Sequence, residues 1–347
     1  RKTELGMPQG LLIKLRPTGP WRIGPDSGVR DRVGRVYHSD ALFAAVSQAF
    51  AQLGQLDAWL DATARSAEPA VRSAEPAVRL ASCFPYAGET LYVTPPRTLW
   101  PPKESSKVRW KGARFVPVSV VETLASGRGL SEGAWAIDGE SECLVPQRTP
   151  AVAGPFRVAV RSAAAMDREG AGVTAHATAC LEFSPDCGLW TVAQFADDAA
   201  REQWTAPLTA AFRLLADSGF GGERSRGWGR AEMPEITAGE IESLVWKQPA
   251  GDANAFWLLS LLHPAESDAI DWQQGDYALT TRGGRVESAA GWGAPKKLTR
   301  MVAEGSVLIA PAALKGSAPD VAPEGFEHPV YRAGFAVALP IAVKENA

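Results

Sequence analysis

The sequence predicts an α+β protein of two domains, expected at residues 1–240 and 241–347. Two observations carry this prediction. Short runs that alternate apolar and polar residues, typical of half-buried strands, recur along the chain, and between them lie stretches with apolar residues at helical spacing. The length of 347 residues is also enough for two domains with hydrophobic cores of their own.

The first elements are a strand and a helix. Gly10 to Arg16 alternates apolar residues with Lys14 and Arg16, which predicts a half-buried strand with a basic open face. Pro17 to Arg35 is rich in Gly and Arg and is expected to be a long loop or hairpin. Ser39 is expected to cap a helix that Gly54 ends. A strand followed by such a helix is the opening of a ferredoxin-like (RRM-like) βαββαβ unit.

Residues 57–148 are predicted to be a long insertion in this unit. Within them RSAEPAV occurs twice in tandem, at 65–71 and 72–78. Each copy has a proline, which excludes a coiled coil and favours a duplicated linker or a short helical tip.

Regular structure returns after the insertion. Three strands are predicted in the order Phe156–Arg161, Ala177–Phe183 and Leu189–Phe195. A helix follows from Thr205 to Asp217, with Pro207 in its first turn and Gly219 placed to end it. A short strand in AEMPEI then completes the first domain.

The second domain is predicted to be a smaller, degenerate ferredoxin-like sheet. Its strands are expected at Phe256–Leu262, on either side of a turn at Glu304–Gly305, and within Tyr331–Leu339.

A glycine- and arginine-rich loop, GFGGERSRGWGR from Gly219 to Arg230, lies between a predicted helix and a predicted strand. Glycines permit positive φ and close approach of a ligand, free N–H groups in such a loop can form an anion site, and arginine binds phosphate bidentately. The loop lacks the Lys-Ser/Thr ending of a Walker A loop, so nucleotide hydrolysis is not expected. The predicted phosphate binders are Arg224, Arg226 and Arg230, assisted by Ser225 and by the backbone at Gly221, Gly222, Gly227 and Gly229. A mobile turn with solvated arginines is the alternative, and Trp228 either stacks on a base or anchors the loop to the core.

Composition narrows the function further. The net charge of −3 argues against free, nonspecific RNA binding. Any RNA contact would therefore depend on clusters of basic residues, which lie at Lys103 to Arg114, at Lys296 to Arg300 and in the loop.

Cys180, Cys187 and His176 match no common zinc spacing, so buried reduced thiols and no metal are expected. No apolar run approaches the ~20 residues that span a bilayer, and no signal peptide is visible, so we expect a cytoplasmic protein with no membrane contact.

The loop pattern G-x-G-G-x-x-S-R-G-x-G-R resembles the glycine-rich loop of the RAMP superfamily, the ferredoxin-like RNA-binding subunits of CRISPR systems. Three further stretches resemble one subunit of type III-A (Csm) effectors. They are YHSDALFAAV (Tyr37 to Val46), SCFPY (Ser82 to Tyr86), and EGSVLIA with HPVYRAGFAVALP (Glu304 to Ala310 and His328 to Pro340). The resemblance runs in order from about Leu11 to Val343 and is weak between Asp57 and Arg148.

This resemblance implies a non-catalytic subunit that caps the 5′ repeat-derived tag of the crRNA, with no cofactor. It also implies two protein partners, the large polymerase/cyclase-like subunit and a backbone RAMP subunit, in a hetero-oligomeric ribonucleoprotein complex. Further RNA-binding candidates are Arg16, His38, Ser39, Arg148, Arg161, Lys296 and Lys297. Arg148 and Arg161 are expected to border the first sheet, and Lys103 to Arg114 to touch either RNA or the next subunit.

His38 supports an alternative function, because other RAMP nucleases use a histidine to cleave RNA through its 2′-OH. The alternative is a metal-independent endoribonuclease that processes precursor crRNA. No second acid–base partner for His38 is evident in the sequence, and general acid–base catalysis usually needs one. Helix-cap packing or a hydrogen bond to RNA is therefore favoured, and Asp26 and Asp31, among arginines, are interpreted as salt-bridge or turn residues. A third possibility is a scaffold with mostly protein contacts.

Overall fold

The computed structural model describes residues 8–24, 29–65, 75–102, 108–166, 173–247, 253–288 and 291–343. It is an α+β fold with antiparallel sheets and few helices, as predicted. The helices are α1 (Ser39–Gln52), α2 (Leu56–Ala62), α3 (Val118–Ala125), α4 (Asp198–Ser218) and α5 (Ile241–Val245), with 3-10 turns η2 (Val108–Gly112), η3 (Glu132–Ala134) and η4 (Arg224–Arg226).

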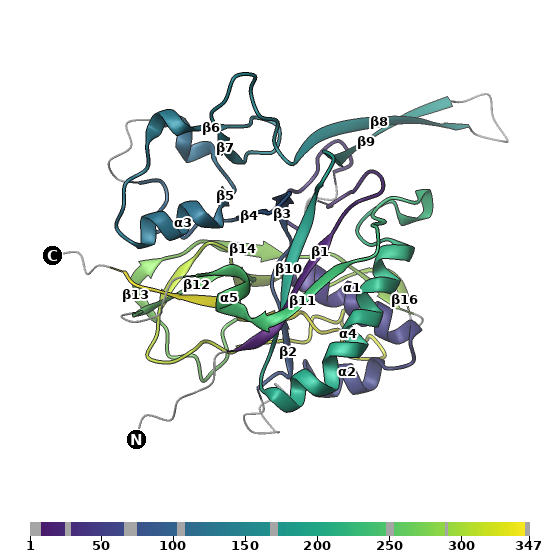
Figure 1. Ribbon diagram of the computed structural model, residues 1–347. Helices are drawn as coiled ribbons and strands as arrows, with labels where there is room; N and C mark the ends of the chain where they lie inside the picture. The colour runs from purple at the N-terminus through teal and green to yellow at the C-terminus, as the bar shows by residue number, and fades with distance from the viewer. Residues whose placement is uncertain are drawn as a thin grey trace.

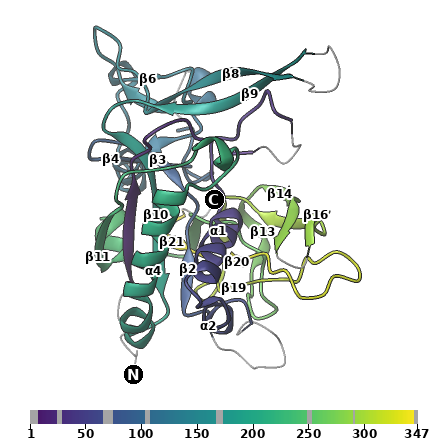
Figure 2. The same cartoon turned by 90° about the vertical axis from the view of Figure 1, so that its right-hand side faces the viewer.

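The first sheet is seven-stranded, in the order β11-β1-β10-β3-β4-β5, with β2 also paired to β10. Its strands are β1 (Gln9–Leu15), β2 (Val78–Leu80), β3 (Phe84–Ala87), β4 (Thr90–Val93), β5 (Val116–Pro117), β10 (Cys187–Phe195) and β11 (Glu235–Glu240). Strand β1 lies between β10 and β11 and buries Leu11, Ile13 and Leu15, the apolar set of its alternating sequence. Helices α1 and α4 cover one side of this sheet (Figures 1 and 2).

Two helix boundaries differ from the sequence prediction. Helix α4 begins at Asp198, because the Asp197 side chain accepts a hydrogen bond from the Ala200 N–H (2.7 Å) and so caps the helix. Pro207 therefore lies inside α4 rather than in its first turn. Ser39 is the first residue of α1 and not its cap, a position taken by His38 without a side-chain capping bond.

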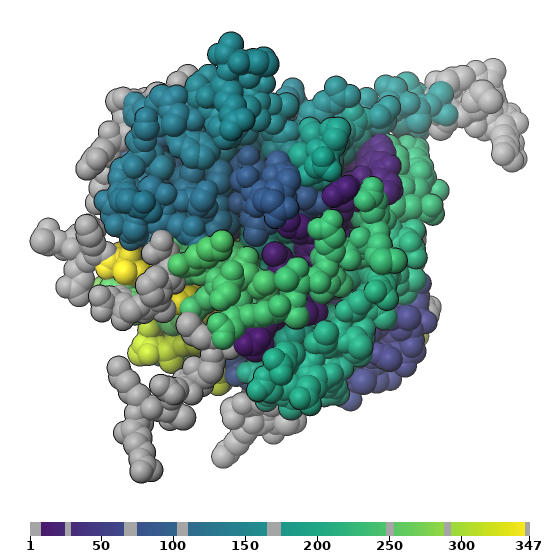
Figure 3. All heavy atoms as spheres, in the orientation of Figure 1, coloured from purple at the N-terminus to yellow at the C-terminus, as the bar shows by residue number. Residues whose placement is uncertain are grey.

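The interval expected to be an insertion, residues 57–148, is only partly one. Strands β2 and β3 within it pair with β10 and are integral to the first sheet. Beyond them the chain forms an upper lobe, which holds α3, a two-stranded sheet of β6 (Trp135–Ile137) and β7 (Leu144–Pro146), and the last two strands of the first sheet, β4 and the edge strand β5 (Figures 1 and 3). Residues 66–74 of the RSAEPAV repeats and residues 103–107 of the basic cluster lie outside the described residues.

Strands β8 (Phe156–Met166) and β9 (Val173–Phe183) were expected in the first sheet, and this is wrong. They pair with each other along their whole length as a separate two-stranded sheet. This hairpin projects away from the body of the molecule (Figure 1).

The second sheet has the order β13-β18-β12-β21. Its strands are β12 (Ala255–Leu258), β13 (Asp271–Asp276), β18 (Val307–Ile309) and β21 (Ala338–Ile341). Around it lie three strand pairs, β14 (Leu279–Arg282) with β17 (Thr299–Val302), β15 (Arg285–Ser288) with β16 (Gly291–Pro295), and β19 (Gly316–Ser317) with β20 (Gly334–Phe335). The described residues between 253 and 343 form no helix.

The two sheets do not have separate cores. One hydrophobic cluster contains Leu11 and Phe212 of the first half together with Trp257 and Val337 of the second. A small second cluster, around Leu258 and Leu308, belongs to the second sheet alone. The two halves of the chain therefore share most of one hydrophobic core, and the predicted division into domains near residue 240 stays a prediction.

A buried ion cluster joins α1 to the C-terminal half. The Asp40 carboxylate accepts hydrogen bonds from Arg282 Nε (3.1 Å), Arg282 Nη2 (3.0 Å) and Arg332 Nη1 (2.6 Å). Burial raises the pKa of Asp40, but the charges and hydrogen bonds of these arginines outweigh it and hold that pKa below its ordinary value. Beside Asp40, Ser39 Oγ accepts the Leu261 N–H (3.0 Å).

Replacement of Asp40 by Asn should therefore destabilise the protein strongly. It removes the carboxylate that two buried guanidinium groups share, for which a loss of about 3–5 kcal/mol in the free energy of unfolding is expected. Denaturant unfolding measures this loss. Asp57→Asn is the matched control, because its ion pair with Arg65 is exposed and should contribute less than about 1 kcal/mol. Equal effects of the two substitutions would contradict the role assigned to Asp40.

Candidate nucleic-acid interface

The Gly-rich loop, residues 219–230, adopts a folded conformation with backbone hydrogen bonds of its own. Gly219 ends α4 with φ +80°, and Gly221, Gly227 and Gly229 also have positive φ. A Cβ atom on Gly229 would lie 2.1 Å from the carbonyl oxygen of Phe220. These glycines are thus required by the fold of the loop itself.

The loop does not offer the free backbone amides that its sequence suggested. The N–H groups of Gly222, Gly227 and Gly229 donate to the carbonyl oxygens of Arg22 (2.9 Å), Arg224 (2.9 Å) and Pro20 (3.0 Å). These bonds tie the loop to itself and to the segment after β1. The predicted contribution of these three amides to phosphate binding is therefore wrong for this conformation.

The side chains of the loop divide into exposed and held groups. Ser225, Arg226 and Arg230 are exposed, with Arg226 Nε 3.2 Å from Glu223 Oε2. Arg224 reaches across to the C-terminal half, where it pairs with Glu287, and its Nη1 also lies 3.4 Å from Gln48 Oε1. Trp228 is only 9% exposed. Of its two interpretations, the structure favours the anchor in the core over stacking on a base.

Three other predicted arginines are placed differently from expectation. Arg16 forms ion pairs with Asp186 (3.5 Å), Glu232 (3.7 Å) and Glu235 (3.6 Å), so its charge is already balanced. Arg161 pairs with Glu182 on the β8–β9 hairpin, and Arg148 is exposed on the segment between β7 and β8. Neither Arg148 nor Arg161 borders the first sheet.

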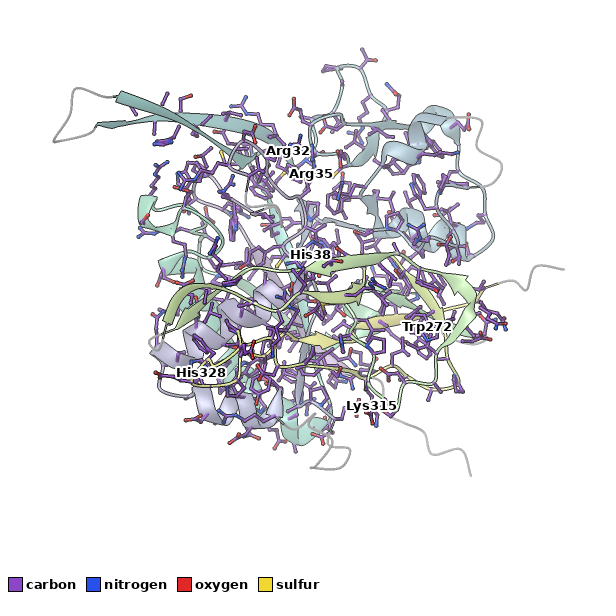
Figure 4. The ribbon with its side chains drawn as sticks, turned by 180° about the vertical axis from the view of Figure 1, so that it is seen from behind. Arg32, Arg35, His38, Trp272, Lys315 and His328 are labelled. Atoms are coloured by element: carbon purple, nitrogen blue, oxygen red, sulfur yellow. The ribbon has the colours of Figure 1, made fainter. Side chains whose placement is uncertain are left out.

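The segment before α1 is held by a buried arginine. Arg22 is buried and donates to the carbonyl oxygens of Val29 (3.0 Å), Arg30 (3.0 Å) and Ala179 (2.7 Å), among others. Seen from behind, Arg32 and Arg35 lie above His38 (Figure 4). Arg35 Nη2 is 3.5 Å from Glu142 Oε1, whereas the Arg32 side chain is exposed.

His38 has an acid–base partner that the sequence did not reveal. Its Nδ1 lies 2.7 Å from Oε1 of Glu304, which also accepts a hydrogen bond from Ser82 Oγ. Burial lowers the pKa of His38, but the Glu304 carboxylate outweighs this effect and raises it above its ordinary value. Burial likewise raises the pKa of Glu304, and the charge and hydrogen bond of His38 bring it below its ordinary value.

A groove of about 1000 Å³ runs between α1, the Gly-rich loop and the C-terminal half. We call it the basic groove, because its lining has more basic residues than carboxylates. The basic residues are Arg224, Arg282, Arg285, Lys296 and Arg332, and the carboxylates are Asp40 and Glu287. Of the predicted candidates it includes Gly221, Arg224 and Lys296, whereas Lys297 is exposed and does not line it.

Sequence reasoning missed Arg282, Arg285 and Arg332, which the fold brings into the basic groove. Two of them lie in RGGR (Arg282 to Arg285), a short Gly/Arg stretch of the same composition as the predicted loop. This composition could have identified Arg282 and Arg285 as candidates from the sequence alone. Arg332 carries no such signal, because its position depends on the contact with Asp40.

The described residues contain no group of three or more His, Cys, Asp or Glu side chains arranged to hold a metal ion. All four cysteines are buried and free. Nor does any described helix have the length and apolar character needed to cross a membrane.

Comparison with known proteins identifies related chains. Residues 251–341 match the model of the CRISPR Csm4 C-terminal domain. Over 98% of this chain and 100% of the other, the fold is similar to a chain of a Csm1-Csm4 cassette in complex with cA4 (18% identity, TM-score 0.59). A chain of a Csm3-Csm4 subcomplex of a type III-A CRISPR-Cas interference complex is similar over 96% and 100% of the two chains (14% identity, TM-score 0.64). No curated protein matches the sequence.

The His38–Glu304 pair predicts how stability depends on pH. Because folding raises the pKa of His38, its contribution is fully present below about pH 6.5, the ordinary histidine value, and is lost as the pH rises through the folded-state pKa. Denaturant unfolding of His38→Gln should lack this loss. His176→Gln, a histidine on the β8–β9 hairpin, is the control and should keep the wild-type profile. A His38→Gln profile that still falls like wild type in this range would contradict the assignment.

Proposed function

We propose that this Csm4-type RAMP subunit holds the 5′ repeat-derived tag of the crRNA in a type III-A CRISPR (Csm) complex and performs no catalysis. The premise is its identity as a Csm4 subunit, which rests on the C-terminal domain match and on the fold of the whole chain. The observation that supports tag binding is the basic groove on a protein whose net charge is −3.

The basic groove suits a strand of RNA better than a small metabolite. Its volume lies at the upper end of the range for small-molecule sites, and its excess of basic over acidic side chains matches a backbone with repeated phosphates. Tyr331 and His328 also line it, and their rings supply flat surfaces for unstacked bases. We therefore assign the phosphates to its arginines and Lys296, and the bases to these rings.

The subunit's neighbours in the complex are part of the same proposal. The related chains occur in assemblies named Csm1-Csm4 and Csm3-Csm4. By analogy, this chain would bind the large polymerase/cyclase-like subunit and a backbone RAMP subunit in antiviral defence. Neighbouring subunits would then complete the RNA channel, with this chain forming one wall at the 5′ end.

We also interpret both sheets as ferredoxin-like units. In the first sheet, β1 is the first strand of the unit, β2 and β3 together are the second, β10 is the third and β11 is the fourth. Their spatial order is therefore fourth, first, third, second, and α1 and α4 lie in the two crossover connections. The second sheet has the same order, β21-β12-β18-β13, without helices in its described residues. This shared order supports a degenerate second copy of the unit.

Cleavage of precursor crRNA is the alternative function, and the His38–Glu304 contact is the observation in its favour. A carboxylate that orients an imidazole is a common catalytic arrangement. Here, however, Glu304 also accepts from Ser82 and is buried where the two halves of the chain meet, which suits a structural contact. Incubation of 5′-labelled repeat RNA with the purified chain and EDTA separates the two functions, because cleavage that His38→Ala abolishes would establish the nuclease.

Replacement of Arg224, Arg226 and Arg230 by Ala should weaken RNA binding and lower its salt dependence. Each phosphate contact to a single strand contributes about 0.7 to the slope of log K against log salt concentration, so three contacts contribute about 2. Fluorescence anisotropy over a salt series measures the slope. Arg213→Ala, on the exposed surface of α4, is the control and should leave it unchanged. An unchanged slope in the triple variant would remove the loop from the interface and would favour a scaffold with mostly protein contacts.

Glu287→Gln should have the opposite effect and strengthen RNA binding. The Glu287 carboxylate occupies Arg224, so a phosphate must displace it, and its removal should improve affinity by about threefold to fivefold, equivalent to roughly 1 kcal/mol. The same anisotropy titration tests this. Glu202→Gln removes an equal charge from the exposed surface of α4 and should change affinity little. Equal gains from both variants would show a general charge effect instead.

A further inference from the structure

The buried part of the basic groove carries more positive charge than its own carboxylate balances. We call Asp40, Arg282, Lys296 and Arg332 the groove floor. All four line the groove, and the two guanidinium groups share the single carboxylate of Asp40. One carboxylate offsets one of these three cations, so the floor by itself has a net charge of about +2 when Lys296 is protonated.

Lys296 is the cation of the floor that the protein leaves unpaired. Its backbone N–H donates to the Gly284 carbonyl oxygen (2.9 Å), which fixes the residue just after β16. Among the described residues, its half-buried side chain has neither an ion pair nor a hydrogen bond. Lys297 differs, because it is exposed and its N–H donates to Val321 instead (2.9 Å).

The surroundings of Lys296 disfavour its charge in the unbound protein. Burial and the nearby Arg332 and Arg282 lower its pKa, while Asp40 and Glu287 oppose that effect.

A second sign of a missing partner is Arg332, which is 5% exposed and whose Nε is a buried donor without an acceptor among the described residues. Buried donors in folded proteins are nearly always satisfied, so this site lacks an acceptor.

We propose that the groove floor binds one backbone phosphate of the RNA strand, with Lys296 as the contacting cation and Arg282 and Arg332 held behind it by Asp40. This inference rests on the proposed function and adds a fixed register to it. Of the arginines of the Gly-rich loop, Arg224 lines the groove, whereas Arg226 and Arg230 are exposed on the loop and can follow any strand. The floor, in contrast, presents one unpaired cation, Lys296, at a fixed position in the groove, which suits a single anion. A lysine suits this position, because its ammonium is a compact charge that several orientations of a phosphodiester can reach.

The first test compares two adjacent lysines in the full-length chain with 5′-labelled single-stranded repeat RNA. Lys296→Gln should weaken binding about tenfold or more and lower the salt slope by about 0.7, one phosphate contact. Lys297→Gln removes the same charge one residue away and should leave both values near wild type. Lys296→Arg should restore the slope. An equal loss from Lys296→Gln and Lys297→Gln would overturn the proposal.

The second test identifies the phosphate. RNAs with a neutral methylphosphonate at one linkage at a time are titrated against wild type and Lys296→Gln. The proposal predicts one linkage in the tag at which wild type loses affinity and Lys296→Gln loses no more. Losses spread evenly over all linkages in both proteins would contradict a fixed phosphate site.

These results separate the inference from the function on which it rests. RNA binding that depends on Arg224 but not on Lys296 would overturn the floor site and leave tag binding intact. Absence of RNA binding by wild type in the assembled complex would overturn the proposed function itself. Inorganic phosphate that protects the wild type but not Lys296→Gln against thermal unfolding, without competing with RNA, would assign the floor to a free anion and would also overturn the proposal.

Discussion

The bond between Asp40 and the arginines Arg282 and Arg332 is the interaction on which the rest of the structure depends. It joins the first turn of α1 to the end of β14 and to the segment before β20, more than 240 residues away in the sequence. The two preceding residues also contact the C-terminal half. His38 Nδ1 pairs with the Glu304 carboxylate, and Ser39 Oγ accepts a hydrogen bond from the Leu261 N–H. Three consecutive residues thus join α1 to the C-terminal half, in addition to the hydrophobic cluster that both halves share, and the basic groove lies beside α1.

The proposed binding of RNA in this groove is compatible with an acidic net charge because the charge is unevenly arranged. Elsewhere on the surface, basic residues such as Arg16 and Arg161 are paired with carboxylates. In the groove, basic side chains outnumber carboxylates, and one of the two carboxylates, Glu287, is itself bound to Arg224. This arrangement favours the proposed binding, because a strand that reaches the groove meets a concentrated positive field.

The sequence predicted the α+β class, many of the strands and the end of α4, because these follow from local patterns of two to four residues. Strand β1 alternates, and Gly219 ends α4 in the left-handed region. The long-range contacts were not predictable in this way. Nothing in the sequence near His38 indicates Glu304, and the pairing of β8 with β9 as a projecting hairpin depends on which neighbour each strand meets. The loop was located by composition, yet its amides proved to be used within the fold, since composition does not show where N–H groups point.

Photocrosslinking tests most directly whether the tag of the crRNA lies in the basic groove. The complex would be assembled with crRNA that carries 4-thiouridine at single positions, irradiated, and digested for mass spectrometry. Crosslinks from tag nucleotides are expected on the groove segments, at residues 37–51, 220–224, 282–287, 295–296 and 328–332. Crosslinks to these segments from the 3′ end of the crRNA, with the tag attached elsewhere, would contradict this placement of the tag.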